Sequence, residues 1–221
     1  MPIGSLIAPG ARMSAITFAV FGALTGTVAA ACALARIGEV DAIEIGRYCL
    51  GLQTTASSPC RGVDGVLYVF PGLVFGVVFG PLLYFRRQLG GAGAVAYALA
   101  AWVANAVAVS VSVAAVHPVD DLLPFDSLII HTAISGVIGG AVGGGLLGAV
   151  LAVLNPEVKH TLPIAVAAGL GVLTPILIML DNPGIFVFYI VWQGGYAAAL
   201  GAALPAPRPP GAELLARAAP P

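Results

Sequence analysis

The sequence predicts an all-α, polytopic integral membrane protein built as a bundle of six transmembrane helices. Of its 221 residues, 59% are hydrophobic and only 9% are charged, whereas soluble domains carry about 25% charged residues. The apolar residues also gather in six runs that contain no Asp, Glu, Lys or Arg. Each run has about the length that a helix needs to cross ~30 Å of hydrocarbon. The predicted spans are 13–35, 67–85, 92–116, 128–154, 161–180 and 184–204.

These spans leave one longer loop over 36–66, several short turns and a tail over 205–221. Residues 1–204 therefore form a single membrane domain. The tail is rich in Pro and Ala, and we expect a flexible cytoplasmic end. The net charge of −1 provides no basic surface for nucleic acid. The expected partners are membrane lipid and either another membrane protein or a second copy of the chain.

Basic residues orient the spans. With the N-terminus in the cytoplasm, six basic residues fall inside and three outside, which favours both termini inside under the positive-inside rule. The Arg86-Arg87 pair after the second span is the clearest anchor. The bias toward Ala, Gly, Val and Arg suggests a bacterial inner membrane. The alternative for the first run is a cleaved signal peptide, but its length of about 20 residues exceeds the usual ~7–15-residue apolar core of such peptides.

The first outer loop contains two features of interest. Residues 38–50 alternate acids with aliphatic residues, a pattern typical of a short interfacial helix. Cys49 and Cys60 bracket the polar segment that follows, and on the outer side they are expected to form a disulfide. Two unrelated free thiols, or a redox pair, are the alternatives, although the spacing does not match C-x-x-C.

Prolines and turn residues divide the second half of the chain. Pro156 ends the fourth span, and residues 181–184 (Asp-Asn-Pro-Gly) predict a tight outer turn between the last two spans. Pro81 and Pro175 lie within predicted spans and are expected to bend or open those helices.

Glycines recur at every fourth position in two spans, which places bare backbone along one face of each helix. Such faces allow close helix contact in lipid. We expect internal packing through them, with oligomerisation as the alternative. The glycines are Gly72, Gly76 and Gly80 in the second span, and Gly136, Gly140, Gly144 and Gly148 in the fourth.

Polar side chains within the spans are uncharged apart from one histidine. Asn105, His131, Ser135 and Gln193 form the candidate polar cavity, open to the outer side. The alternative is that each of them only makes hydrogen bonds between or within helices. The absence of intramembrane acids and bases argues against an ion-coupled transporter or a voltage sensor.

The pair Ser135-Gly136 near the outer end of the fourth span is similar to a feature of rhomboid-type intramembrane proteases. Those proteins also have a six-helix core and a long first outer loop. Their G-x-S-G motif reads AISG over 133–136 here, and WQGG over 192–195 stands where their sixth-span histidine is expected. A serine nucleophile needs such a base. The resemblance therefore implies an inactive relative and no protease.

Two histidines, His117 and His131, flank three aspartates in one outer loop, and such a set could bind a divalent cation, or the imidazoles a haem. No ligand spacing is regular, so a solvated acidic loop is expected, with no cofactor or metal.

Two function classes follow. The first is a binding, scaffolding or accessory subunit for a membrane partner or lipid. The alternative is a permease or channel for a small neutral or amphipathic solute. No complete catalytic set is present, and we predict no enzyme.

Overall fold

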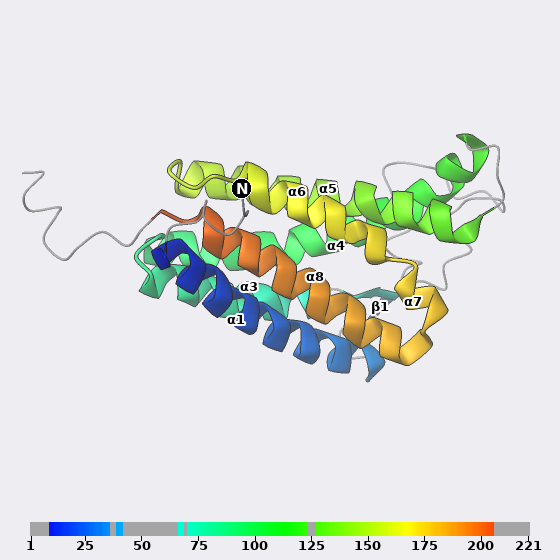
Figure 1. Ribbon diagram of the computed structural model, residues 1–221, viewed down its shortest axis with the longest axis horizontal. Coiled ribbons are helices and arrows are strands. Elements are labelled where there is room, and N and C mark those ends of the chain that lie inside the picture. Colours follow the sequence, from blue (N-terminus) through cyan, green and yellow to red (C-terminus); the bar gives the residue numbers. More distant parts are fainter. Residues whose placement is uncertain (1–8, 36–38, 42–65, 69, 123–126, 206–221) are drawn as a thin grey trace, which may run out of the picture.

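The computed structural model describes residues 9–35, 39–41, 66–68, 70–122 and 127–205. Within these ranges, helices run lengthwise beside one another, and a short antiparallel ribbon joins strand β1 to strand β2 (Figure 1). The helices are α1 (Pro9–Leu34), α3 (Phe70–Phe85), α4 (Gly91–Leu122), α5 (Leu128–Leu154), α6 (Thr161–Leu170), the 3₁₀ turn η3 (Gly171–Leu173), α7 (Ile176–Met179) and α8 (Asp181–Ala203). The strands are β1 (Glu39–Asp41) and β2 (Val66–Tyr68).

Four helices are long and apolar enough to cross a membrane, as a multi-pass integral membrane protein requires. They contain residues 14–34, 91–115, 128–154 and 182–203. Helix α3 has 16 residues, so it is only about 24 Å long at 1.5 Å per residue. The α6–α7 segment is interrupted. The structure therefore supports four long spans directly, and a count of six remains a prediction.

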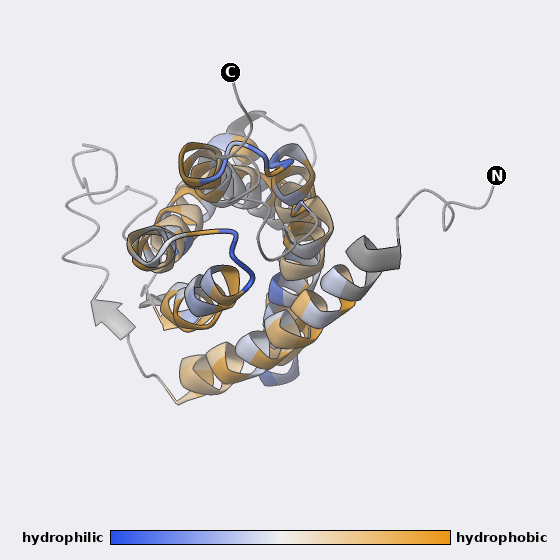
Figure 2. Ribbon diagram, turned by 90° about the vertical axis from the view of Figure 1, so that its left-hand side faces the viewer, coloured by the Kyte–Doolittle hydropathy of each residue, from blue (hydrophilic) through white to orange (hydrophobic). Residues whose placement is uncertain are grey.

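The helices close into a ring in the order α1, α3, α4, α5, α6 and α8, with α8 returning to α1 (Figure 2). Along α4 the outward face carries Val95, Leu99 and Val103, which are 52–62% exposed. Its inward face carries Tyr97 and small residues such as Ala101, which are buried. The two faces differ mainly in side-chain size, because both lipid and protein interior accept apolar groups.

Glycines set the distance between neighbouring helices. On α5, Gly136, Gly140, Gly144 and Gly148 all lie against the α6–Thr174 segment. On the adjoining face of α5, Gly139 and Gly143 lie against Ser112 and Ala108 of α4. Gly72, Gly76 and Gly80 of α3 likewise lie against α4. Both glycine series therefore contact the chain's own helices.

Hydrogen bonds join the two termini of the described chain to the same end of the bundle. Arg86 Nη2 donates to Ser14 Oγ at 3.1 Å, which ties α3 to the start of α1. Asn155 Nδ2 donates to the Gln88 carbonyl at 3.0 Å, and the Lys159 N–H donates to the Ala203 carbonyl at 3.3 Å. The turns α3–α4 and α5–α6 and the end of α8 therefore meet at this end.

Helix α3 ends at this same end in a Schellman-type motif, although the residue there is not glycine. Arg87 has a φ of 54°, and the Arg87 and Gln88 N–H groups donate to the Tyr84 and Leu83 carbonyls. This left-handed position usually carries glycine. The chain therefore keeps a charged residue where glycine would fit the backbone with less strain.

The structure corrects four sequence-based predictions. The expected turn at 181–184 is instead the first turn of α8, since Pro183 is tolerated there, where helical N–H groups have no partner. Helix α4 continues past 116 through Pro118 to Leu122. Helix α3 begins at Phe70 and not at 67, because β2 precedes it. Residues 39–41 of the expected interfacial helix form β1. The rest of that helix, together with Cys49 and Cys60, lies outside the described residues.

The expected opening at Pro175 is present. Proline has no N–H to donate to the carbonyl four residues earlier, which here belongs to Gly171. Thr174 replaces that donor twice, through its N–H at 3.0 Å and through its Oγ1 at 2.6 Å. The helix is therefore broken between α6 and α7 without leaving this carbonyl unsatisfied.

The glycine contacts predict a matched pair of variants on α5. In Gly140→Ala, the new Cβ would stand 3.0 Å from the Ala167 carbonyl carbon and 3.2 Å from Ala168 Cα. We expect the free energy of unfolding to fall by about 1–3 kcal/mol from overpacking. Gly145→Ala is the control, since nothing lies within 4 Å of its added Cβ. Equilibrium unfolding in mixed SDS and mild detergent measures both, and equal stabilities would contradict the packing described here.

Candidate functional site

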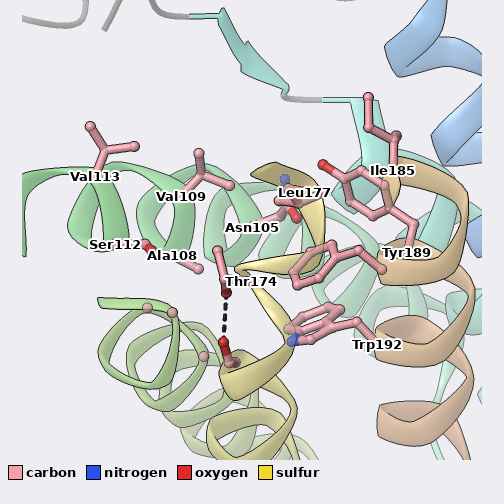
Figure 3. A pocket seen from close by; sticks show the side chains of 15 residues that line it. Asn105, Ala108, Val109, Ser112, Val113, Thr174, Leu177, Ile185, Tyr189 and Trp192 are labelled. Atoms are coloured by element: carbon pink, nitrogen blue, oxygen red, sulfur yellow. Dashed lines mark hydrogen bonds between the residues drawn. The ribbon is translucent and has the colours of Figure 1, made fainter. Parts of the chain in front are cut away.

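A cavity of about 350 Å³ lies between α4, α5, the η3–α7 break and α8 (Figure 3). Its position follows from the length of α3. Gly72, in the first turn of α3, lies against Asn105 of α4, while α4 continues to Leu122. From Asn105 to the Leu122 end of α4, helix α3 is no longer present in the ring. A space therefore remains between α4 and α8.

Most of the cavity surface is apolar, with a few polar groups placed around it. Asn105 and Ser112 come from α4, Thr174 from the helix break, and Tyr189 and Trp192 from α8. No residue that lines it is charged. An apolar pocket of at least 300 Å³ with a few fixed polar groups is typical of small-ligand sites.

The break in the α6–α7 segment contributes backbone to the cavity wall. Gly171 and Thr174 line it, and Figure 3 shows the Thr174 hydroxyl directed to the Gly171 carbonyl. Irregular backbone at membrane depth is tolerated where protein buries it or where it lines a water-filled cavity. Here Gly171 is buried and Thr174 satisfies its carbonyl, so the break is tolerated at this depth.

A second, smaller space of about 10 Å³ adjoins the cavity. Asn105 and Trp192 line both spaces, while Gln193 and Tyr196 line only the smaller one. Its volume is close to that of one water-sized probe. Asn105 and Gln193 are thus neighbours across a shared, water-sized gap.

The other two members of the predicted polar set lie elsewhere. His131 and Ser135 are buried on α5, and neither lines the cavity or the adjoining gap. Ser135 Oγ donates to the His131 backbone carbonyl at 2.8 Å, within the same helix. The arrangement brings together two of the four residues and leaves the Ser135 hydroxyl hydrogen-bonded to the backbone of its own helix.

Below the gap, aromatic side chains fill the axis of the ring. Phe75 and Phe79 stack with centroids 4.1 Å apart, and Phe18 packs against Phe79 at 5.5 Å. Tyr196 meets Phe75 edge-on and stacks with Trp192. The cavity is therefore closed toward the end where the termini lie.

Three polar atoms near this aromatic core have no hydrogen-bond partner among the described residues. They are Gln193 Oε1 and the hydroxyls of Tyr97 and Tyr196, and all three residues are at most 1% exposed. Each such buried atom costs about 1–3 kcal/mol. The centre of the bundle thus combines a small gap with unsatisfied hydrogen-bonding capacity.

Sequence reasoning missed Tyr189 and Trp192 as lining residues. Together with Ile185 and Phe188 they follow a helical spacing on α8, and this pattern could have identified one inward face. Among the described residues, no group of three or more His, Cys, Asp or Glu side chains could hold a metal ion.

Comparison with known proteins adds no assignment, since no family model, curated protein or solved structure matches the chain.

The two tryptophans allow the water content of the cavity to be measured. In Trp102→Phe the remaining Trp192 reports on the cavity, and in Trp192→Phe the remaining Trp102, which is 40% exposed on the outer face of α4, reports on the bilayer. We expect aqueous acrylamide to quench Trp192 several-fold more strongly than Trp102. Lipids with brominated acyl chains should show the reverse order. Stronger quenching of Trp192 by the brominated lipids would mean that the cavity opens to lipid.

Proposed function

We propose that the protein is a six-span membrane protein that binds a small, uncharged, amphipathic solute in the cavity between α4 and α8, as a permease for that solute. The observation that carries this proposal is the cavity itself, with Asn105 adjoining the gap at Gln193. An apolar wall suits the hydrocarbon part of such a solute, and the amide and hydroxyl groups suit its polar part.

An uncharged solute is favoured because the lining offers no counter-ion. Moving an ionised group out of water without a partner costs several kcal/mol. Phe75 and Phe79 fill the axis of the ring between the cavity and the end of the bundle that holds Arg86 and Lys159, and in this proposal they close that side. A permease needs a second state, in which this aromatic plug moves.

The accessory-subunit hypothesis assigned the contact with a partner to the glycine faces and to the outer loop, most of which lies outside the described residues. The glycine series of α3 and α5 lie against α4 and the α6–Thr174 segment. They offer no surface to a second protein, and we therefore favour solute binding over scaffolding.

Matched amphiphiles test the proposal. Octanol, octanoate and octylammonium share one chain and differ in charge. We expect octanol to raise the melting temperature of the purified protein in a saturable manner, and to bind at least about tenfold more tightly than either ion, because a tenfold preference requires only about 1.4 kcal/mol.

Two variants of α4 provide the control. Val109→Phe places a ring in the cavity, and it should weaken octanol binding about tenfold or more, a change of about 1.4 kcal/mol. Val103→Phe makes the same change on the outer face, where Val103 is 54% exposed, and it should bind as the wild type does. Equal binding by both variants would place octanol outside the cavity and remove the basis of the proposal.

We further propose that both termini lie in the cytoplasm, in keeping with a bacterial inner membrane. Arg86, Arg87 and Lys159 all lie at the end of the bundle that holds the start of α1 and the end of α8, and positive residues favour the cytoplasmic side.

Cysteine labelling tests this orientation. In a chain with Cys32, Cys49 and Cys60 replaced by Ser, Gly91→Cys introduces a thiol at the first residue of α4, beside the α3–α4 turn, where nothing lies within 4 Å of the added Cβ. An impermeant maleimide should label it in inside-out vesicles and not in right-side-out vesicles. Labelling only in right-side-out vesicles would reverse the assigned orientation.

A further inference from the structure

The Gln193 amide is held in one orientation by α3. Its Nε2 donates to the Pro71 carbonyl at 3.2 Å, across the bundle. A carbonyl oxygen can only accept, so the amide nitrogen must face Pro71. The amide oxygen Oε1 is therefore directed away from α3, and it has no partner among the described residues. This oxygen needs a donor.

Besides the Asn105 amide across the gap, two buried phenols lie in the core of the bundle. The hydroxyls of Tyr97 and Tyr196 interact electrostatically with each other, but neither makes a hydrogen bond of ordinary geometry within the described chain. Tyr196 lines the 10 Å³ gap together with Gln193 and Asn105. The residues that line the gap therefore include one whose amide oxygen needs a donor, one whose hydroxyl can donate or accept, and the Asn105 amide.

We propose that this gap is a hydroxyl-binding site: it takes a single O–H group, which donates to Gln193 Oε1 and accepts from Tyr196. The gap has room for about one water-sized group. The group is either a water molecule or, resting on the proposed function, the hydroxyl of a solute that occupies the larger cavity. Asn105 and Trp192 line both spaces, so a solute in the cavity lies beside the gap.

This site defines a substrate class more narrowly than the cavity does. An ether, a ketone or a carboxylate has no O–H to donate to Gln193 Oε1. An ammonium group can donate, but no carboxylate lines either space to balance its charge. The preferred solute of the cavity is accordingly an alcohol with an apolar body.

The test compares octanol with methyl heptyl ether, which has a similar size but no O–H donor. Binding of each is followed by Trp192 fluorescence in the full-length Trp102→Phe chain. We expect octanol to bind about tenfold more tightly than the ether, as the loss of one buried hydrogen bond implies. Tyr196→Phe and Gln193→Leu should reduce this ratio to about one, because each removes one partner of the O–H group. Tyr84→Phe, at an exposed tyrosine outside the site, should keep it.

Tyr196→Phe removes a single oxygen, so it carries the test if Gln193→Leu does not fold. A high-resolution experimental structure without added solute completes it. An oxygen within hydrogen-bonding distance of Gln193 Oε1 identifies water as an occupant, and its replacement by the alcohol oxygen identifies the solute.

Each outcome is decisive. A preference for octanol that Tyr196→Phe abolishes supports the site, with the solute as donor. An ordered oxygen in the gap without such a preference supports it, with water as donor. If neither probe binds while the ordered oxygen is present, the proposed function fails and the hydroxyl site stands. No preference together with an empty gap overturns the inference.

Discussion

Close contact between helix backbones is the constraint on which this structure depends. In lipid, apolar side chains gain little by leaving one apolar environment for another, so association must come from van der Waals contact and hydrogen bonds at short range. Glycine allows this close contact because it has no side chain to keep two helix backbones apart. On α5, two adjoining faces of bare backbone hold α4 on one side and the α6–Thr174 segment on the other. Helix α5 contacts both α4 and the α6–Thr174 segment, so it sets the positions of these two walls of the cavity.

The cavity is a consequence of two local departures from regular helix. Helix α3 begins late, at Phe70, so the ring is incomplete beyond Asn105. The α6–α7 segment breaks at Pro175, and Thr174 satisfies the carbonyl that the proline leaves without a donor. The cavity lies where α3 is absent and where the α6–α7 segment is broken. Below them, stacked Phe75 and Phe79 close the axis.

Polar chemistry in this bundle is concentrated where packing is least complete. Gln193 is fixed by its bond to Pro71, and it lines a gap with Tyr196 in which no lining residue is charged. Such an arrangement can recognise a neutral hydrogen-bonding group without the desolvation cost of a charge. Ser135, by comparison, donates its hydroxyl to the backbone of its own helix.

Composition and periodicity were sufficient to determine the class of this protein and the rough limits of its long helices, because a run of membrane length without any charge is typical of a helix that lies in lipid. The fourth predicted span, 128–154, matches α5. The turn predicted at 181–184 was wrong, since Asp-Asn-Pro-Gly suits the first turn of a helix as well as a loop, and only the packing of α8 on α7 and α1 selects between them. Depth along a span could be read from the chain, but rotation about the helix axis could not. Only the tertiary structure brought Asn105 to Gln193 and separated both from Ser135. The direction of a side chain depends on the rotation of its helix, and that rotation is set by the neighbouring helix against which the glycines of the helix pack.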